Sequence, residues 1–513
     1  MRLTKLWIGN FKNLIDVTFD FDKESLVTVL IGQNATAKSN LIEALVWIFR
    51  NLDLGEDPRF DYCLDYLCRG RHIRIDAKTT RASKVQVTVD GQAVSYKSFM
   101  KDPNHQYLPS NLFGYYSGPS RRLERLFDKH QEIFYRQLLK GTKAPFRPLF
   151  YARTVHSQYV LLAFFAFKDE ELLDFLRECL HIVAFESATF VLKQPSWYQK
   201  GMAKDDIFWG ARGVVRNFLE DLRALGEISD KHPERVRPPM RRARTQERLN
   251  LRVPSLDSLY RLASRYANNV EFFKMLESTY ISDLIDELKI EVKKEGVEPS
   301  LEFSELSEGE QQLLTVLGLL RFTKEDESLF LLDEPDTHLN PAWKLQYMDL
   351  LEKVVGRNET IHVFVVTHDP LLVGGLRKEQ VQVFSFRGPE RRVVVTRPEV
   401  DPLGMGVAGL LTSELFGLPT TLDRITQEKL DRKKELAIKE ELTKEERIEL
   451  AELDDELSRM GFLSTFRDPL YSQFVKALRE YDQFKRPALT KDQKEEQAKI
   501  AREIVARLKA EQT

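Results

Sequence analysis

A glycine-led loop that ends in lysine and serine is the first feature of the sequence that could do chemistry. Gly32–Ser39 reads Gly-Gln-Asn-Ala-Thr-Ala-Lys-Ser and has the length of the phosphate-binding pattern G-x-x-x-x-G-K-[ST]. In such a loop, backbone amides and a helix N-terminus bind phosphate, the lysine reaches the β- and γ-phosphates, and the serine hydroxyl holds Mg²⁺. The sequence therefore predicts an ATP and Mg²⁺ site that contains Gly32, Gln33, Asn34, Ala35, Thr36, Ala37, Lys38, Ser39 and Asn40.

The loop departs from the pattern at one position. Ala37 stands where a glycine normally precedes the lysine, and Ala35 is a second alanine in the same loop. A methyl group leaves less room for backbone and phosphate to approach each other. We expect nucleotide binding to survive this change, and slow hydrolysis is an open alternative.

Two adjacent carboxylates form the second chemical feature. Four apolar residues precede Asp333 and Glu334, and Pro335 follows at once, which ends the strand. Asp333 is placed to bind Mg²⁺, directly or through water, and Glu334 to polarise the attacking water as a general base. One strand later, His368 has the spacing of a γ-phosphate sensor, although a lone histidine at a strand end is usually structural. The predicted catalytic residues are thus Glu334, Lys38 and His368.

The segments that must position these residues read as a parallel α/β core. Leu26–Ile31 is a short β-rich run, and apolar residues then recur at helical spacing from Leu41 to Ile48. A second strand pattern occurs at Ser328–Leu332 and again at His362–Thr367, with a helix between them. Strand, loop and helix in this order are the context that a phosphate-binding loop needs.

The remaining segments differ in pattern. Short alternating runs between residues 60 and 94, with a turn at Asp90-Gly91, predict an antiparallel meander. Residues 123–293 are mostly helical in pattern, apart from Lys231–Arg248, which is rich in Arg and Pro. We expect that segment to be a mobile loop, either a solvated linker or an arm that contacts nucleic acid. Near the C-terminus, a capping box at Thr443–Glu446 and a helical pattern over Asp423–Glu440 predict an antiparallel helical hairpin.

Composition excludes several classes of protein. Lys and Arg (77) nearly balance Asp and Glu (79), so any polyanion binding must come from local patches. Cys63, Cys68 and Cys179 are too few for a disulfide framework, and no further Cys or His pair completes a zinc site. The most apolar stretch, Tyr159–Phe167, has about half the length of a membrane span. We therefore expect a cytoplasmic protein with no membrane contact.

A serine and a glycine lie between the two phosphate motifs. Ser307 and Gly309 precede an apolar helix just ahead of the Asp333 strand, and the segment resembles an ABC signature motif. Alone, a serine at a helix start is a common cap. In the ABC superfamily the signature contacts the γ-phosphate bound to another subunit. The resemblance therefore implies a homodimer or higher homo-oligomer that closes over ATP through its ATPase heads, with Asp336 in the D-loop at that interface.

The whole pattern is similar to the RecF, SMC and OLD branch of ABC-type ATPases. The residues that carry this resemblance are Ile8–Leu14, the Lys38–Asn40 end of the loop, and Asp333–Pro341. It implies an α/β fold: an ABC-type ATPase head with a mixed sheet, an antiparallel N-terminal meander, a parallel P-loop core, a large helical insertion and a C-terminal helical hairpin. The expected domains are 1–120 and 301–400 for the two halves of the head, 121–300 for the insertion with its basic loop at 231–248, and 401–513 for a tail that binds a partner or oligomerises.

A narrower resemblance extends further along the chain. Phe113–Gly118 with Arg121–Glu124, Val155–Val160, and Leu410–Gly417 look like the PtuA-type ATPases of Septu and retron-associated antiphage systems. This resemblance implies an HNH-type endonuclease as partner, and a nucleic acid, either DNA or retron RNA–DNA. Gln158 is then a candidate for the Q-loop glutamine that contacts the nucleotide site.

Three functions remain open at this point. The first is a defence ATPase whose nucleotide state controls a partner nuclease; after His368 no Toprim-like Glu is followed by Asp-x-Asp, so we do not expect this chain to cut nucleic acid itself. The second is a DNA-repair ATPase like RecF without a nuclease partner. The third is an ATP-bound scaffold in which Ala35 and Ala37 suppress turnover.

Overall fold

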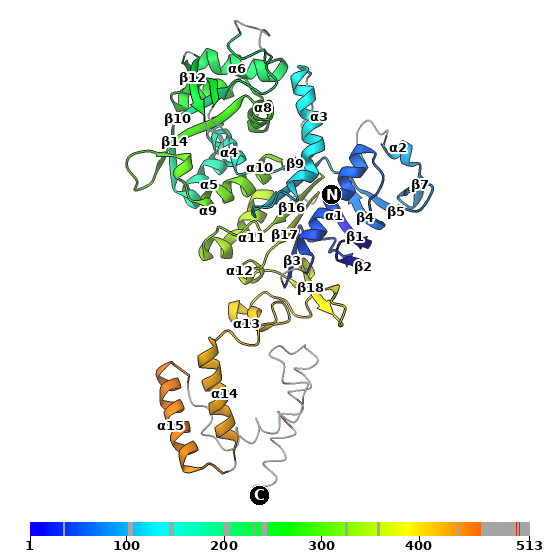
Figure 1. Cartoon of the computed structure of the whole chain (residues 1–513), viewed down its shortest axis with the longest axis vertical. Coiled ribbons are helices and arrows are strands. Elements are labelled where there is room, and N and C mark those ends of the chain that lie inside the picture. The colour runs from blue at the N-terminus through cyan, green and yellow to red at the C-terminus, as the bar shows by residue number, and fades with distance from the viewer. Residues whose placement is uncertain are drawn as a thin grey trace. The chain divides into compact units, whose positions relative to one another are not determined.

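The chain divides into two compact units. The computed structural model describes residues 1–33, 36–100, 106–142, 148–199, 206–229, 231–236, 244–323, 327–356, 360–439, 441–462, 499 and 502 (Figure 1). The first unit comprises Met1–Leu30, Ala35–Thr367 and Phe386–Val395. The second comprises Ile31–Asn34, His368–Ser385 and Thr396–Thr513.

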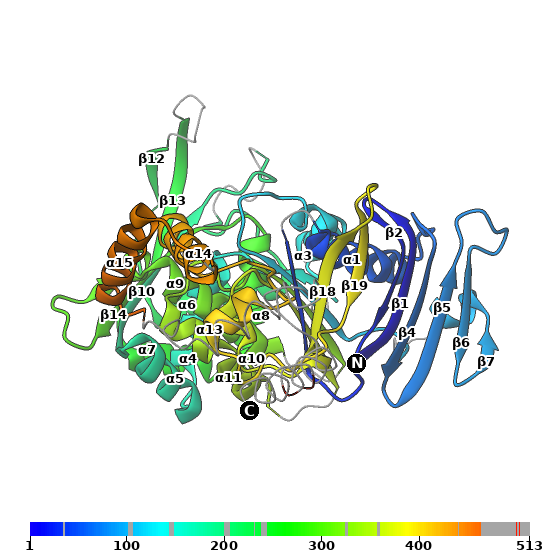
Figure 2. The same cartoon turned by 90° about the horizontal axis from the view of Figure 1, so that it is seen from below.

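The N-terminal part of the first unit is an antiparallel sheet, seen in blue in Figure 2, with the strand order β2-β1-β4-β5-β6-β7. The turn between its last two strands has positive φ at Asp90 (49°) and Gly91 (80°), the conformation of a two-residue hairpin turn. The predicted meander is therefore confirmed. A short helix, α2, follows. The bounds are β1 (Arg2–Phe11), β2 (Leu14–Asp20), β4 (Tyr62–Cys68), β5 (Arg71–Ala77), β6 (Val85–Val89), β7 (Gln92–Val94) and α2 (Tyr96–Met100).

A parallel sheet forms the centre of the first unit, with neighbouring strands in the order β3-β17-β16-β8-β9. Every residue of β16 and β17 is buried, which is why these strands read as unbroken apolar runs rather than as alternating ones. Helix α1 connects β3 to the meander, and α11 connects β16 to β17. The bounds are β3 (Val27–Gly32), β8 (Asn111–Tyr116), β9 (Leu149–Tyr151), β16 (Ser328–Asp333), β17 (Ile361–Val366), α1 (Lys38–Leu54) and α11 (Pro341–Val355).

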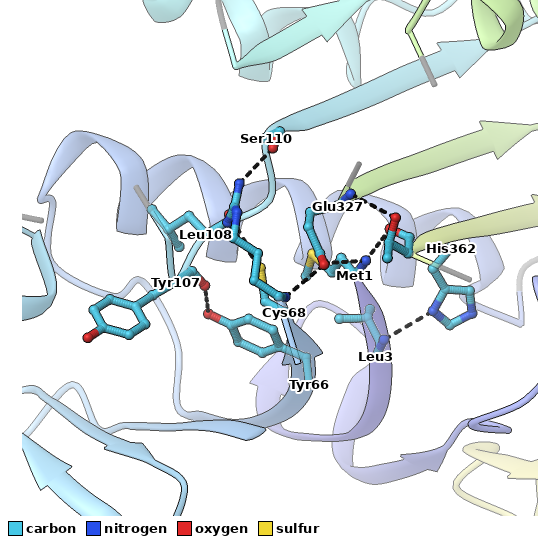
Figure 3. A network of polar contacts seen from close by, with 11 residues as sticks. Met1, Leu3, Tyr66, Cys68, Tyr107, Leu108, Ser110, Glu327 and His362 are labelled. Carbon is cyan, nitrogen blue, oxygen red and sulfur yellow. Dashed lines mark hydrogen bonds and ion pairs between the residues drawn. The ribbon is translucent and has the colours of Figure 1, made fainter. Parts of the chain in front are cut away.

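A buried imidazole ties the two sheets together. The backbone N–H of Leu3 donates to Nδ1 of His362 at 3.1 Å (Figure 3). On the other side of the ring, Nε2 lies 2.9 Å from the hydroxyl of Thr28. Burial lowers the pKa of His362 well below its usual value, so the ring is neutral. Since Nδ1 accepts a hydrogen bond, Nε2 carries the proton and donates it to Thr28.

A buried carboxylate forms the second tie in Figure 3. Glu327, which is 4% exposed, pairs with the amino group of Met1 at 2.5 Å and accepts from the backbone N–H of Arg69 at 2.7 Å. Nearby, the Tyr66 hydroxyl donates to the carbonyl of Tyr107 at 2.8 Å. A buried carboxylate is stable only when its charge is compensated, so these contacts hold β1 and β4 against the start of β16.

The block between residues 121 and 300 contains the predicted helices and also a second sheet, with the order β11-β13-β10-β14-β15 and β12 beside β13. The expectation of a mostly helical block missed this sheet, because its strands pair with partners far along the chain. The bounds are α3 (Asp128–Leu139), α4 (Val155–Ala166), α5 (Glu170–Leu180), β10 (Ile182–Lys193), α6 (Gly213–Leu225), β11 (Glu227–Ile228), β12 (His232–Val236), β13 (Arg244–Val253), α7 (Leu256–Ala263), α8 (Asn269–Ile281), β14 (Ile285–Lys294) and β15 (Leu301–Glu302).

The prediction of a mobile loop over Lys231–Arg248 is wrong for its two ends. Residues His232–Val236 form β12 and pair antiparallel with the start of β13, from His232 opposite Arg248 onward. The reason lies just beyond the segment: Leu249, Leu251 and Val253 are buried on one face of β13, and this alternation extends the strand back into the basic residues. The middle of the segment, 237–243, lies outside the described residues.

The most apolar helix of the chain is a core helix. Residues Tyr159–Ala166 of α4 are all buried, and α4 packs against α7, α8 and the helical stretch after residue 313. This stretch consists of a π-helical turn (Leu314–Gly318) and α10 (Leu319–Thr323), and it continues directly from α9 (Glu308–Leu313). Among the described residues, no helix combines the length and apolarity that spanning a bilayer demands.

The second unit contains the predicted helical hairpin, drawn in orange in Figure 1. Thr443 accepts a hydrogen bond from the backbone N–H of Glu446, as the capping box predicted. The helices run antiparallel, because Lys429, in the first half of α14, pairs with Glu456 near the end of α15, while Lys439, just after α14, pairs with Glu446 near the start of α15 at 2.5 Å. The bounds in and around this unit are α12 (Pro370–Val373), β18 (Val381–Arg387), β19 (Arg392–Thr396), α13 (Gly406–Thr412), α14 (Arg424–Ile438) and α15 (Lys444–Arg459).

Candidate nucleotide site

The phosphate-binding loop ends in a left-handed residue. Helix α1 begins at Lys38, and Ala37 before it has φ 77° and accepts a hydrogen bond from the N–H of Leu41 at 3.0 Å. Only glycine adopts this conformation without steric cost, so the structure explains why a glycine is normal at this position. Thr36 and Lys38 are nearly inaccessible, 1% and 4% exposed. Asn34 and Ala35 lie outside the described residues.

The first glycine of the loop belongs to the second unit and is also required there. Gly32 has φ 144°, and a Cβ at this position would lie 2.2 Å from the carbonyl oxygen of Phe384 in the same unit. Gln33 and His368 are further members of that unit. Their roles toward the nucleotide therefore stay predictions.

Opposite charges meet beside the start of α1. Burial lowers the pKa of Lys38 to about 8, while the carboxylates of Asp333 and Glu334 raise it. Burial likewise raises the pKa of Asp333 to about 6; the hydrogen bond from Ser39 and the charges of Arg122 and Lys38 act in the opposite direction. The sequence motifs that predicted one site are thus in electrostatic contact, although Lys38 and Asp333 lie far apart along the chain.

The two predicted metal ligands also meet. The Ser39 hydroxyl donates to Oδ1 of Asp333 at 3.1 Å, and Asp333 is 2% exposed. One hydroxyl and one carboxylate oxygen are the hard donors that Mg²⁺ takes from a protein when phosphates and water supply its other ligands. This donor set fits Mg²⁺. Among the described residues, no group of three or more His, Cys, Asp or Glu side chains is arranged to hold a metal by itself.

Glu334 is held by its backbone. It has φ 55°, its N–H donates to the carbonyl of Val366 at 2.9 Å, and its own carbonyl accepts from the Thr337 hydroxyl at 3.0 Å. A non-glycine residue in the left-handed region is strained, and such strain is typical of functional sites. Hydrogen bonds at both its N–H and its carbonyl therefore fix the backbone of Glu334, the predicted general base.

The signature segment caps its own helix. Ser307 accepts from the N–H of Glu310 at 3.3 Å and donates to the Glu310 carboxylate at 2.8 Å. A Cβ on Gly309 would lie 2.7 Å from the carbonyl of His338, so only glycine allows the segment after β16 to pack this closely. The structure thus gives both residues a role within the chain, and their contact with a nucleotide on another subunit remains a prediction.

Two other predicted residues have separate settings. Asp336 is 4% exposed and accepts a hydrogen bond from the Thr367 hydroxyl at 3.0 Å, which links the turn after β16 to the end of β17. Gln158 is half-buried on α4. No hydrogen bond between described residues joins it to Lys38, Ser39 or Asp333, so its assignment as the Q-loop glutamine stays a prediction.

Sequence reasoning missed three charged residues next to the site. Glu43, on α1, is 4% exposed and pairs with Lys12 and with Arg122, the latter at 3.3 Å. Lys12 also lies 3.4 Å from the side-chain oxygen of Asn40, whose amide donates to Asn13 at 2.6 Å. The sequence signal that could have indicated Glu43 is a charged residue among the apolar residues of α1.

A glutamine after the signature was missed as well. Gln312, which is 4% exposed, lies 3.2 Å from the hydroxyl of Tyr115 and 3.4 Å from the carbonyl of Glu334. Its side-chain oxygen accepts from the N–H of His338 at 2.9 Å. Its side chain therefore connects α9 with the residues that follow β16.

Known proteins resemble this chain in the same region. A family model described as "AAA domain, putative AbiEii toxin, Type IV TA system" matches residues 195–374, which include Ser307, Asp333 and Glu334. The Septu protein PtuA of Bacillus mycoides (strain KBAB4) is 27% identical over 208 residues, which is 39% of this chain. The match spans only 28% of the length of that relative.

Solved structures of SMC heads and of RecF also resemble this chain at low sequence identity. Three solved structures show sequence identities of 13–15% with it. The SMC head bound to the C-winged helix domain of ScpA gives a TM-score of 0.34 and covers 78% of this chain and 98% of that one (13% identity). The SMC head domain from Thermotoga maritima gives 0.32 with 78% and 100% (14% identity), and RecF–ATP of the RecFOR pathway gives 0.28 with 77% and 97% (15% identity).

Replacing Ala37 with glycine should stabilise the first unit of the chain. The change removes a methyl group from a residue at φ 77°, so we expect the free energy of unfolding to rise by about 1 kcal/mol in urea denaturation. Ala44→Gly, in the interior of the same helix, is the matched control and should lower it by about 1 kcal/mol or more. A less stable Ala37→Gly variant would contradict the strained loop.

Replacing Asp333 with asparagine should stabilise the protein without nucleotide at neutral pH. The pKa of Asp333 is about 6 in the fold against 3.8 as its ordinary value. Because the folded pKa is the higher one, the protonated form of Asp333 stabilises the fold. This contribution is complete when the pH is below the ordinary pKa, and it is lost as the pH rises through the folded pKa. Because Asn keeps the Ser39 contact but carries no charge, the variant should exceed wild type by about 1–3 kcal/mol at about pH 7.5.

Urea unfolding at about pH 5 and about pH 7.5 measures this difference, which should shrink at the lower pH. Asp20→Asn is the control, because that side chain is 66% exposed and should give a curve parallel to wild type. An Asp333→Asn variant that is less stable than wild type at the higher pH would show that the charge of Asp333 is fully compensated in the fold.

Proposed function

We propose that this chain is the ATP-hydrolysing subunit of a prokaryotic antiphage defence complex, and that its nucleotide state controls a partner nuclease. The observation that carries the proposal is the meeting of Lys38 and Ser39 with Asp333 and Glu334 at one sheet edge, together with the sequence match to Septu PtuA. The first supports ATP chemistry, and the second supports the defence setting.

The chain's own residues suit hydrolysis of ATP. Lys38 is a buried cation at the N-terminus of α1, where both its charge and the helix dipole favour bound phosphate. Ser39 and Asp333 would hold Mg²⁺, which neutralises phosphate charge during transfer. Glu334, fixed through its backbone, would orient and deprotonate the attacking water. His368 would act as the γ-phosphate sensor.

Assembly is part of the proposal. Ser307 and Gly309 would meet ATP held by a second copy of the chain, which makes a homodimer or a larger homo-oligomer the active form. The α14–α15 hairpin offers a further surface for assembly. By analogy with Septu systems, the partner would be an HNH-type endonuclease that acts on nucleic acid, DNA or retron RNA–DNA, while this chain supplies no nuclease site.

A second candidate function is supported by the strain at Ala37. A phosphate-binding loop with a strained backbone is suited to slow turnover of ATP. An ATP-bound scaffold would need no turnover at all. A RecF-like role in DNA repair without a nuclease is the third candidate. ATPase assays with and without DNA and partner separate the three.

Two substitutions test the ATPase assignment. Lys38→Ala should abolish ATP binding in calorimetry, because a buried charge that contacts phosphate is lost. Glu334→Gln should keep ATP binding but lower the rate of phosphate release by about 100-fold or more and retain a dimer in size-exclusion chromatography with ATP. Glu352→Gln, on the exposed side of α11, is the control and should behave as wild type. Unchanged hydrolysis in Glu334→Gln would place the base elsewhere.

Copurification tests the defence assignment. The chain, tagged in its native operon, should elute with an HNH-type endonuclease, and the complex should cut nucleic acid only in one nucleotide state. Elution alone, with DNA-stimulated ATPase activity, would support the repair role instead.

A further inference from the structure

Arg122 lies beside Asp333, next to the proposed phosphate site. It follows β8, whose Tyr116 pairs in register with Asp333 of β16, so the loop 117–123 leaves the sheet at the level of the metal-ligand pair. In parallel sheets, ligands bind at this carboxyl edge. Its guanidinium is 5.6 Å from the ring of Tyr116 and within ion-pair distance of two carboxylates.

Those two carboxylates are buried while Arg122 is not. Nε lies 3.3 Å from Oε1 of Glu43, and one terminal nitrogen lies 3.7 Å from Oδ2 of Asp333. Both carboxylates are at least 94% buried, whereas the Arg122 side chain is 40% exposed. The 3.7 Å separation is longer than a hydrogen bond, so the terminal N–H groups remain able to donate.

The loop that carries Arg122 is anchored at both ends. The N–H of Ser117 donates to the carbonyl of Asp333 at 3.3 Å, and its hydroxyl lies 2.8 Å from that of Thr337. At the other end, Glu124 pairs with Arg153 at 2.8 Å. The position of Arg122 is therefore set by the sheet edge and not by a free loop.

We propose that Arg122 is a further phosphate ligand of the nucleotide site: Glu43 holds its Nε edge, and its terminal N–H groups bind the phosphates that Lys38 also binds. The inference rests on the proposed ATP site. A divalent cation at Ser39 and Asp333 repels the guanidinium, which then needs an anion within reach. Phosphate oxygens supply it, and the planar fork of arginine matches their geometry.

Binding of ATP with Mg²⁺ and of inorganic tripolyphosphate with Mg²⁺, measured by calorimetry on the full chain, tests the proposal. Arg122→Ala should weaken both by about tenfold, because one charge-assisted contact is lost. Arg122→Lys should lose less, since it keeps the charge without the fork. Arg121→Ala is the matched control: it removes the same charge from the same loop, but its 63% exposed side chain pairs with Glu124, so affinity should stay within about twofold.

Three results would overturn the assignment. Unchanged affinity in Arg122→Ala, with a lower melting temperature in the absence of nucleotide, would make Arg122 a structural counter-charge of Glu43 and Asp333. A loss for ATP alone, without a loss for tripolyphosphate, would move the contact to the base or ribose. An equal loss of affinity in Arg121→Ala would show that the effect comes from the general positive charge of the loop and not from a contact of Arg122. Failure of wild type to bind ATP, or equal binding by Lys38→Ala, would instead refute the proposed nucleotide site itself.

Discussion

The burial of opposite charges at the carboxyl edge of the parallel sheet is the constraint on which the rest of the site depends. Lys38 and Asp333 are both almost inaccessible, and burial alone would drive each toward its neutral form. Their mutual attraction offsets part of that cost. The remaining cost lowers the stability of the fold, and the same low-dielectric setting would strengthen the binding of phosphate and metal that we propose for this edge.

Strand register explains how these charges come to one place. β8, β16 and β17 run parallel and end at the same level, so the residues that follow them share one edge. Hydrogen bonds then fix the first residue beyond the strands: Glu334 donates to the carbonyl of Val366, and Ser117 donates to that of Asp333. Because these are backbone contacts, the edge keeps its geometry when side chains exchange partners.

The sequence predicted the residues whose motifs are local. A loop between strand and helix identified Lys38 and Ser39, an apolar strand with two terminal carboxylates identified Asp333, and the capping box identified α15. Glu43 and Arg122 escaped prediction because their significance lies in a pairing between distant segments, which no local pattern encodes. The sheet of the 121–300 block was missed for a related reason, since its strands pair with partners far along the chain. Roles that need a second copy or a bound nucleotide, such as those of Ser307 and His368, are beyond both the sequence and a single chain.

Gln312 has a mechanical consequence. One buried amide spans the gap between helix α9 and the carbonyl of Glu334, and the same amide receives the N–H of His338. If α9 moves further than a hydrogen bond can stretch, the carbonyl of Glu334 and the N–H of His338 must move with it. Otherwise the buried amide of Gln312 loses its hydrogen-bond partners, which is costly. A displacement of α9 would therefore be transmitted through the Gln312 side chain to the backbone of Glu334, the residue we propose as the general base.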